Sequence, residues 1–223
     1  MAGIAEQITH VRATLPEHVT LVCVSKYQPV EAIREAYEAG ERHFGESRVQ
    51  ELQRKVPTLP ADIHWHFIGH LQTNKVRDLL KLRPYLIQSV DSIKLLHAIN
   101  DEAGKQGIIQ DILLELHVAR EETKSGLSID EFRSLIAAIK HQTSNIGNIR
   151  LCGLMGMATN TDDEQEIRRC FHALHEQFVW LQQQAPDHSP LILSMGMSDD
   201  YPLAIEQGTT MIRLGSAVFG DKL

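Results

Sequence analysis

The feature that most constrains this chain is a repeated alternation between short β-rich runs and segments with helical periodicity. Strands that alternate with helices in this way predict a parallel sheet. Within the 223 residues we expect strands at 20–26, 43–46, 64–69, 86–91, 111–119, 148–158, 190–196 and 210–215. Eight parallel strands are the number that closes a (β/α)8 barrel.

The segments between these runs carry start and stop signals of helices. Pro29 opens a helical run that ends just before Gly40, and the stretch 162–184 begins with acidic residues. Both patterns are typical of helix ends. Residues 1–14 are amphipathic and lack a long apolar run or a small-residue cleavage site. We therefore expect an extra N-terminal helix there, and neither a signal peptide nor a membrane span.

The prediction is an α/β fold, a single (β/α)8 TIM barrel domain over residues 1–223 with an extra N-terminal helix. Its 43% hydrophobic residues are enough to bury one sizeable core. No long linker, low-complexity tract or shift in composition divides the chain. An open doubly wound sheet is the alternative, because strand order cannot be read from one sequence, but no Gly-rich dinucleotide fingerprint follows the first strand.

Charge and cysteine content narrow the class of function. The formal net charge of -7 argues against a basic surface for nucleic acid or anionic membrane. We therefore expect a small molecule as the partner. Cys23, Cys152 and Cys170 form no CxxC pair and are odd in number, which is typical of reduced thiols in a cytoplasmic protein.

Lys26 is the first candidate for chemistry. It ends the first predicted strand, at the face where (β/α)8 barrels place active sites. Because side chains alternate along a strand, Val22, Val24 and Lys26 should share the face that fills the barrel. Partial burial there would favour the neutral amine, the form that attacks an aldehyde to make a Schiff base. The alternative is a lysine that extends from a strand end into solvent.

Two small-residue turns near the C-terminus predict a phosphate site. Ser194, Gly196 and Ser198 lie where the seventh strand gives way to a helix, and the run that starts at Arg213 adds a second turn after the eighth. Barrels commonly bind phosphate at this place, although such residues also serve as ordinary turns. Arg213 shares a face with Gly215, so its guanidinium is expected either to point inward to a ligand ring or to form an ion pair.

Other chemistries are less well supported. His64 and His66 share a strand face, as a metal pair would, but strands six to eight carry no histidine and only His117 on the fifth could join them. A metal-dependent hydrolase is therefore disfavoured, and we expect no metal. No GxSxG elbow supports a Ser/His/Asp triad either. Gln72, with Lys75 three residues later, is expected to cap the next helix or to contact a ligand.

Ordered blocks along the whole chain resemble the pyridoxal phosphate homeostasis protein family, which has the fold of the alanine racemase N-terminal domain. The blocks lie at 24–26, 44–46, 49–51, 65–69, 71–72, 74–75, 124–126, 153–155, 157–158, 193–198, 213–215 and 219–220. The resemblance implies pyridoxal 5'-phosphate (PLP) held as a Schiff base on Lys26. It implies that the phosphate is held around Ser194, Ser198, Gly215 and Ser216, and that Arg213 faces the pyridine nitrogen.

One departure from the family lies after the second strand. The family usually reads Gly-Glu-Asn there, and this chain has Ser47 in the third position. The shorter side chain is expected to weaken a contact near the cofactor, so Ser47 is not counted among its ligands.

The resemblance also implies a role in PLP homeostasis, in which a cytoplasmic monomer buffers PLP or delivers it through transient contact with apo-enzymes. The alternative is a PLP-dependent amino-acid racemase. A racemase needs a second acid or base, supplied in alanine racemase by a tyrosine from an added β domain, and this sequence stops directly after its eighth predicted strand. Arg213 beside the pyridine nitrogen would also weaken the electron sink. We expect no catalytic residue, and Lys75 and Lys124 as candidates for passing the aldehyde on.

Overall fold

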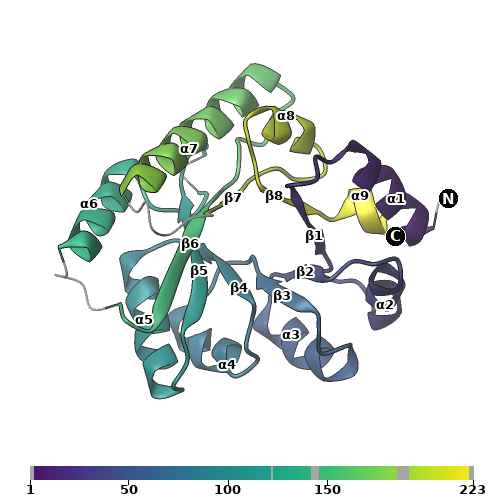
Figure 1. Ribbon diagram of the computed structural model, residues 1–223, viewed down its shortest axis with the longest axis horizontal. Helices are drawn as coiled ribbons and strands as arrows, with labels where there is room; N and C mark the ends of the chain where they lie inside the picture. Colours follow the sequence, from purple (N-terminus) through teal and green to yellow (C-terminus); the bar gives the residue numbers. More distant parts are fainter. Residues whose placement is uncertain (1–2, 122, 142–145, 185–190, 221–223) are drawn as a thin grey trace.

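The computed structural model describes residues 3–121, 123–141, 146–184 and 191–220. Eight parallel strands pair in chain order and close into one barrel. The strands are β1 Thr20–Val24, β2 His43–Glu46, β3 His64–Phe67, β4 Leu86–Val90, β5 Gln110–Leu116, β6 Ile149–Gly156, β7 Ile192–Ser194 and β8 Met211–Leu214. The helices lie around the outside of this barrel (Figure 1). The predicted (β/α)8 TIM barrel is therefore confirmed.

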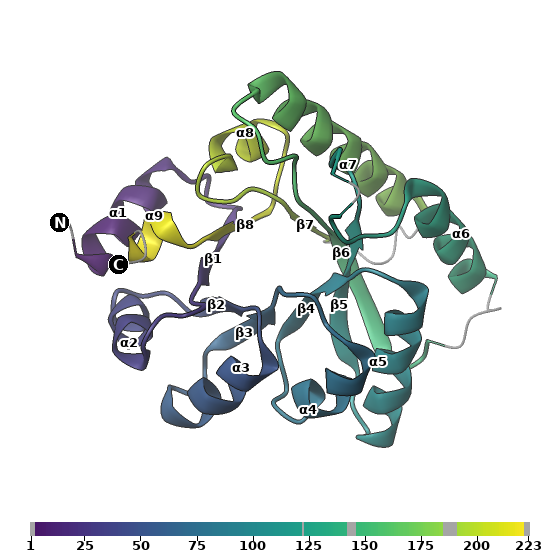
Figure 2. The same cartoon turned by 180° about the vertical axis from the view of Figure 1, so that it is seen from behind.

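The helices follow the strands in the predicted alternation, and α1 precedes β1 as the expected extra N-terminal helix. They are α1 Ile4–Thr14, α2 Val30–Glu38, α3 Val49–Lys55, α4 Val76–Leu80, α5 Ile93–Lys105, α6 Ile129–Lys140, α7 Glu164–Gln184, α8 Tyr201–Glu206 and α9 Ser216–Phe219, with short 3-10 turns η1 Val56–Thr58 and η2 Thr73–Lys75. Helix α1 packs beside α9, so the two ends of the described chain meet at one side of the barrel (Figures 1 and 2).

Every strand except β2 is shorter than predicted. β1 stops at Val24, β3 stops at Phe67, and β7 spans three residues instead of the predicted 190–196, of which Pro190 lies outside the described residues. At the end of β3 the chain passes very close to the preceding loop, because a Cβ placed on Gly69 would lie 2.2 Å from the Ser47 carbonyl oxygen. This close approach joins the loops after β2 and β3, which no single-strand pattern relates.

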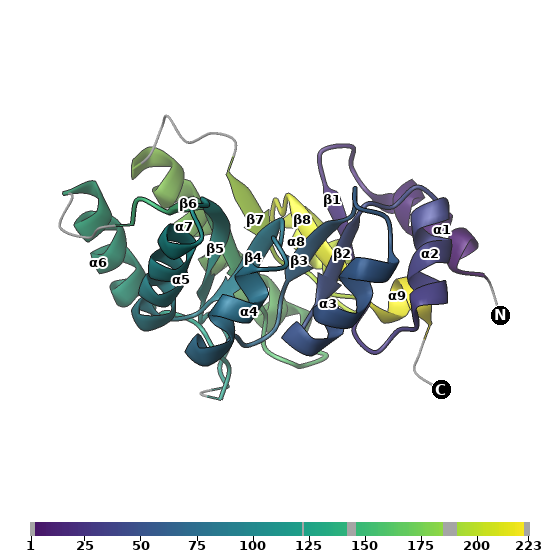
Figure 3. The same ribbon diagram turned by 90° about the horizontal axis from the view of Figure 1, so that it is seen from below.

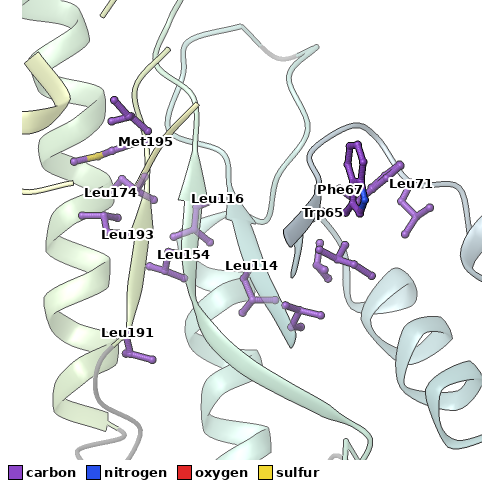
Figure 4. Packing of buried hydrophobic residues seen from close by; sticks show 14 of the residues in the cluster. Trp65, Phe67, Leu71, Leu114, Leu116, Leu154, Leu174, Leu191, Leu193 and Met195 are labelled. Carbon is purple, nitrogen blue, oxygen red and sulfur yellow. The ribbon is translucent and has the colours of Figure 1, made fainter. Parts of the chain in front are cut away.

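Apolar side chains form two layers. One lies between the strands and the helices, and Figure 4 shows part of it, including Leu174 of α7 and Leu193 of β7. The other fills the barrel interior with Val22, Leu113 and Met155, among others. This division follows from the alternation of side chains along each strand. Figure 3 shows the barrel from the side, with α1 and α2 on one side of the strands and α6 and α7 on the other.

All three cysteines are free; Cys23 and Cys170 are buried and Cys152 is half-buried. No helix within the described ranges is long and apolar enough to cross a membrane.

Candidate functional site

The predicted site residues follow three strands at the carboxyl end of the barrel. β1 pairs with β8, with Cys23 opposite Leu214, and a Cβ on Gly215 would lie 3.7 Å from that of Val24. Lys26 and Gly215 therefore leave neighbouring strands at the same end. The structure brings both residues to one sector of the barrel mouth.

Lys26 itself departs from the expected position. The strand has already ended at Val24, and Lys26 and Tyr27 form an exposed turn in which Tyr27 adopts a φ of 64°. The prediction that Lys26 is partly buried is therefore wrong, because the residue is exposed. The residue can be reached from solvent.

A buried polar cluster fixes the point where the chain turns. Ser25 Oγ donates to Glu46 Oε1 at 2.7 Å, and Lys55 Nζ from α3 donates to the same oxygen at 2.7 Å. Lys55 Nζ also donates to the Ser25 carbonyl oxygen at 2.9 Å. Ser25, Glu46 and Lys55 are all buried. These contacts hold Ser25 on the outer side of the barrel and thereby place Lys26 on the rim.

Two backbone N–H groups converge on one oxygen beside this turn. The amides of Gly215 and Ala217 both donate to Ser198 Oγ, each at 3.2 Å. Ser216, between them, is exposed. Backbone N–H groups directed at a single oxygen also suit a phosphate oxygen. The structure therefore brings Ser198, Gly215 and Ser216 together in an arrangement that fits an anion.

Ser194 is placed differently from this group. It is fully buried, and its hydroxyl accepts from Arg213 Nη1 at 2.6 Å and donates to Gln88 Oε1 at 2.7 Å. This hydroxyl supports Arg213 inside the barrel, and the placement does not favour the predicted contact between Ser194 and phosphate.

Arg213 is buried and also donates to the Gly156 carbonyl oxygen at 3.2 Å. In the part of the chain that the structure describes, no acidic side chain forms an ion pair with it, so the predicted alternative of an ion pair is not found. Burial lowers its pKa to about 10, although Glu115 and Asp200 act in the opposite direction. The result is a cation held inside the mouth without a direct counter-ion.

A chain of hydrogen bonds continues from Arg213 through the barrel. Gln88 Nε2 lies 2.9 Å from His66 Nδ1, and His66 Nε2 lies 2.9 Å from His43 Nδ1. Because a guanidinium can only donate, Ser194 must accept from Arg213 and donate to Gln88. Gln88 must then donate to His66 Nδ1, which leaves the proton of His66 on Nε2 and directs it to His43. Arg213 thus fixes which group donates and which accepts in each of these hydrogen bonds.

The same hydrogen bonds involve His64 and His66, whose spacing on the strand resembled that of a metal pair. His64 Nδ1 lies 3.3 Å from His43 Nε2, so the histidines bond to one another. Among the described residues, no group of three or more His, Cys, Asp or Glu side chains is arranged to hold a metal ion. Gln88 was missed by sequence reasoning; alternation could have placed it inside the barrel, but its partners are visible only in the fold.

These hydrogen bonds give a testable expectation for the two inner histidines. Burial, reinforced by neighbouring histidines, lowers the pKa of His66 well below its usual value, and burial lowers that of His43 to about 4. Long-range 1H–15N NMR at about pH 6 should therefore show both rings neutral with the proton on Nε2. A positively charged ring, or an Nδ1 proton on His66, would contradict the assigned direction of the chain.

Two other lysines singled out by the sequence lie near the mouth. Lys75 is half-buried and lines a cavity of about 200 Å3 together with Ser47 and His70. Lys124 donates to the Ala158 carbonyl oxygen at 2.6 Å and borders a separate cavity of about 450 Å3. The two lysines therefore face different hollows.

Known proteins resemble this chain over nearly its whole length. It matches the family described as alanine racemase, N-terminal domain, over residues 1–222. A pyridoxal phosphate homeostasis protein of Aquifex aeolicus is 39% identical over 203 residues, which cover 91% of this chain and 86% of the relative. One of Helicobacter pylori is 37% identical over 204 residues, covering 91% and 88%. The chain belongs to the pyridoxal phosphate homeostasis protein family. The family predicted from the sequence is thereby confirmed.

Solved structures agree with this membership of the pyridoxal phosphate homeostasis protein family. PipY of Synechococcus elongatus PCC7942 without PLP is 37% identical, with a TM-score of 0.90, over 97% of this chain and all 100% of PipY. PipY with PLP bound is 39% identical, with a TM-score of 0.86 and the same coverage. An alanine racemase of Clostridium difficile 630 is 14% identical, with a TM-score of 0.80 over 99% of this chain and 57% of the racemase, which shows a shared barrel fold.

Proposed function

We propose that this chain binds PLP at the carboxyl end of its barrel and takes part in PLP homeostasis by buffering or delivering the cofactor. The observation that carries the proposal is the convergence of three features on one sector of the mouth. They are the exposed amine of Lys26, the pair of N–H groups directed at Ser198 Oγ, and the buried guanidinium of Arg213. The PLP-bound structure of PipY supports it.

The residues present suit the parts of the cofactor. Lys26 provides a primary amine, and the bound cofactor supplies the aldehyde carbon that this amine attacks. Ser198, Gly215 and Ser216 would hold the phosphate through backbone N–H groups and hydroxyls. Arg213 would donate to the pyridine nitrogen, with Ser194 orienting its guanidinium through the 2.6 Å hydrogen bond.

A role without catalysis is supported by the surroundings of Arg213. A guanidinium that donates to the pyridine nitrogen keeps that nitrogen unprotonated, which weakens the electron sink used in PLP chemistry.

Tyr27 is the tyrosine next to Lys26 in the chain, and its ring lies 5.1 Å from the guanidinium carbon of Arg48. Tyr85 stacks on His64, at the opposite end of the barrel. We infer a carrier with no catalytic residue, in which residues 1–223 act as one domain.

We further propose that the protein is a cytoplasmic monomer that contacts apo-PLP enzymes transiently. The negative net charge and the free cysteines support this setting. Lys75 and Lys124 remain candidates for receiving the aldehyde before transfer, and unchanged release rates in both alanine variants would dismiss them.

The test is an absorbance spectrum of the purified protein with PLP, followed by borohydride reduction and peptide mass mapping. We expect the band of a lysine-bound cofactor and a reduced adduct on Lys26. A colourless protein that PLP does not reconstitute would overturn the proposal. Exchange of the α-hydrogen of alanine with solvent deuterium would instead support the racemase alternative.

A further inference from the structure

Glu115 is a buried carboxyl that faces the interior of the barrel. It lies on β5 two residues after Leu113, which belongs to the interior cluster, and it pairs in register with Met155 of the same cluster. Its side chain is therefore directed inward, one step nearer the carboxyl end. The residue is 3% exposed. Because the strands close in chain order, β5 stands across the barrel from β1 and the turn that carries Lys26 (Figure 1).

Neither oxygen of this carboxyl has a hydrogen-bond donor or an ion pair among the described residues. Glu46 and Glu166 are also buried, but each forms an ion pair. Glu46 pairs with Lys55 at 2.7 Å, and Glu166 pairs with Arg169 at 2.6 Å. The fully buried side-chain oxygens without a partner among the described residues are Glu46 Oε2 and Glu121 Oε2, and Glu115 contributes neither of them. Both oxygens of Glu115 therefore reach the solvent of the barrel mouth, where a ligand can contact them.

The charged groups around Glu115 come from four directions. Burial, reinforced by Asp91 at the end of β4, raises its pKa to about 7; Arg213 on β8, His70 after β3 and His117 after β5 oppose this rise. A substantial fraction of the carboxyl is therefore ionised at neutral pH. It then offers a negative charge inside the mouth, separate from the positive charge of Arg213.

A primary ammonium is the ligand group that best matches this carboxylate. Arg213 can donate to an acceptor on the ligand. The Glu115 carboxylate suits the opposite kind of ligand group, a cation that donates hydrogen bonds. Primary amines in solution have pKa values of about 10, so they are ammonium ions at neutral pH. They must lose a proton before they attack a carbonyl carbon. A carboxylate can both bind such an ion and accept its proton.

We propose that Glu115 binds the ammonium group of an incoming primary amine and deprotonates it, so that the amine replaces Lys26 on the bound aldehyde. This inference rests on the proposed binding of PLP. The Glu115 carboxylate takes one proton, the amine nitrogen bonds to the aldehyde carbon, and the bond from that carbon to Lys26 breaks. All three hydrogens of the ammonium end on the lysine nitrogen, and the carboxylate is regained.

An entry route for such an amine lies beside the site. The cavity of about 450 Å3 is bordered by residues after β6 and β7, including Met157 and Met197. Met157 also packs against the interior cluster that contains Leu113 and Met155. The hollow is therefore bordered by a residue that packs against the barrel interior, on the β6 and β7 side of the mouth.

The test mixes L-alanine with the PLP-loaded protein and follows loss of the Lys26-bound absorbance band, with propionate as the ligand control. We expect Glu115→Gln to lower the second-order rate constant by about 10²-fold. In the unaltered protein the rate should rise and then level off above about pH 7, whereas in the variant it should keep rising with the fraction of free amine, up to the amine pKa of about 10. Glu17→Gln, which removes an exposed charge before β1, should leave the rate unchanged.

A second measurement needs no cofactor and no variant. In the PLP-free protein, the 13C carboxyl resonance of Glu115 should titrate near about pH 7 and shift on addition of ethylamine but not of propionate. An unchanged rate in a PLP-loaded Glu115→Gln protein, or a resonance that ethylamine leaves in place, would overturn this inference. Absence of the absorbance band from the unaltered protein would instead overturn the proposed PLP binding.

Discussion

Replacing Lys26 by alanine is expected to abolish covalent capture of PLP while leaving the fold intact. The side chain is exposed on a turn and makes no hydrogen bond within the described residues, so little stability depends on it. Its amine is the proposed point of attachment, and nothing else in the turn can replace it. The spectrum of Lys26→Ala with PLP should lack the band of a lysine-bound cofactor, and borohydride should leave no reduced adduct in the peptide that contains residue 26.

The matched control is Lys94→Ala, which removes another exposed lysine, on α5. It should bind PLP as the unaltered protein does. Weak, non-covalent binding by Lys26→Ala should remain, because Ser198 and the amides of Gly215 and Ala217 are untouched. A full adduct mapped to Lys75 or Lys124 in the Lys26→Ala protein would contradict the assignment of Lys26 as the attachment residue.

Most of the architecture could be predicted because alternation is a local property. The βα repeat placed all eight strands, and the register of a closed barrel then brings the ends of β1 and β8 together. The ends of the strands could not be predicted. β1 stops before Lys26 because Ser25 bonds to Glu46 and Lys55, which come from other elements.

The interior polar residues were the main omission. Alternation assigns a residue to a face but does not name its partner across the barrel. The Gln88 side chain bonds to Ser194, which is 106 positions away in the sequence, and no local signal links the two. Glu115 shows the same limit, since its lack of a partner becomes visible only when every neighbour is in place. Ser194 was grouped with Ser198 for the same reason; in the fold Ser194 bonds to Arg213 and Gln88, whereas Ser198 accepts from two backbone amides.

Ser47, where the family usually has Asn, occupies a defined place beside the mouth. It lines the cavity of about 200 Å3 with Lys75 and lies against Gly69, where the backbones approach closely. A residue at this position therefore lies on the rim formed by the loops after β2 and β3. Strand β1 separates β2 from β8, which Gly215 follows.

The largest loss of stability is expected from Lys55→Met. Lys55 Nζ is buried and donates to Glu46 Oε1 and to the Ser25 carbonyl oxygen, while Glu46 Oε2 has no hydrogen-bond partner. A methionine of similar length would leave the Glu46 carboxylate buried without a counter-ion. Removal of one partner from a buried ion pair costs about 3–5 kcal/mol, which urea unfolding can measure as a lower midpoint.

Two further variants separate the buried pair from the helix that carries it. Arg54→Met changes the preceding residue of α3, whose side chain is 73% exposed and pairs with Glu51, and should alter stability by less than about 1 kcal/mol. Adding Glu46→Gln to Lys55→Met removes the stranded charge and should restore part of the loss. If Lys55→Met unfolds at the same urea concentration as Arg54→Met, the cluster does not anchor β1 to α3. The position of Lys26 on the rim would then need another cause.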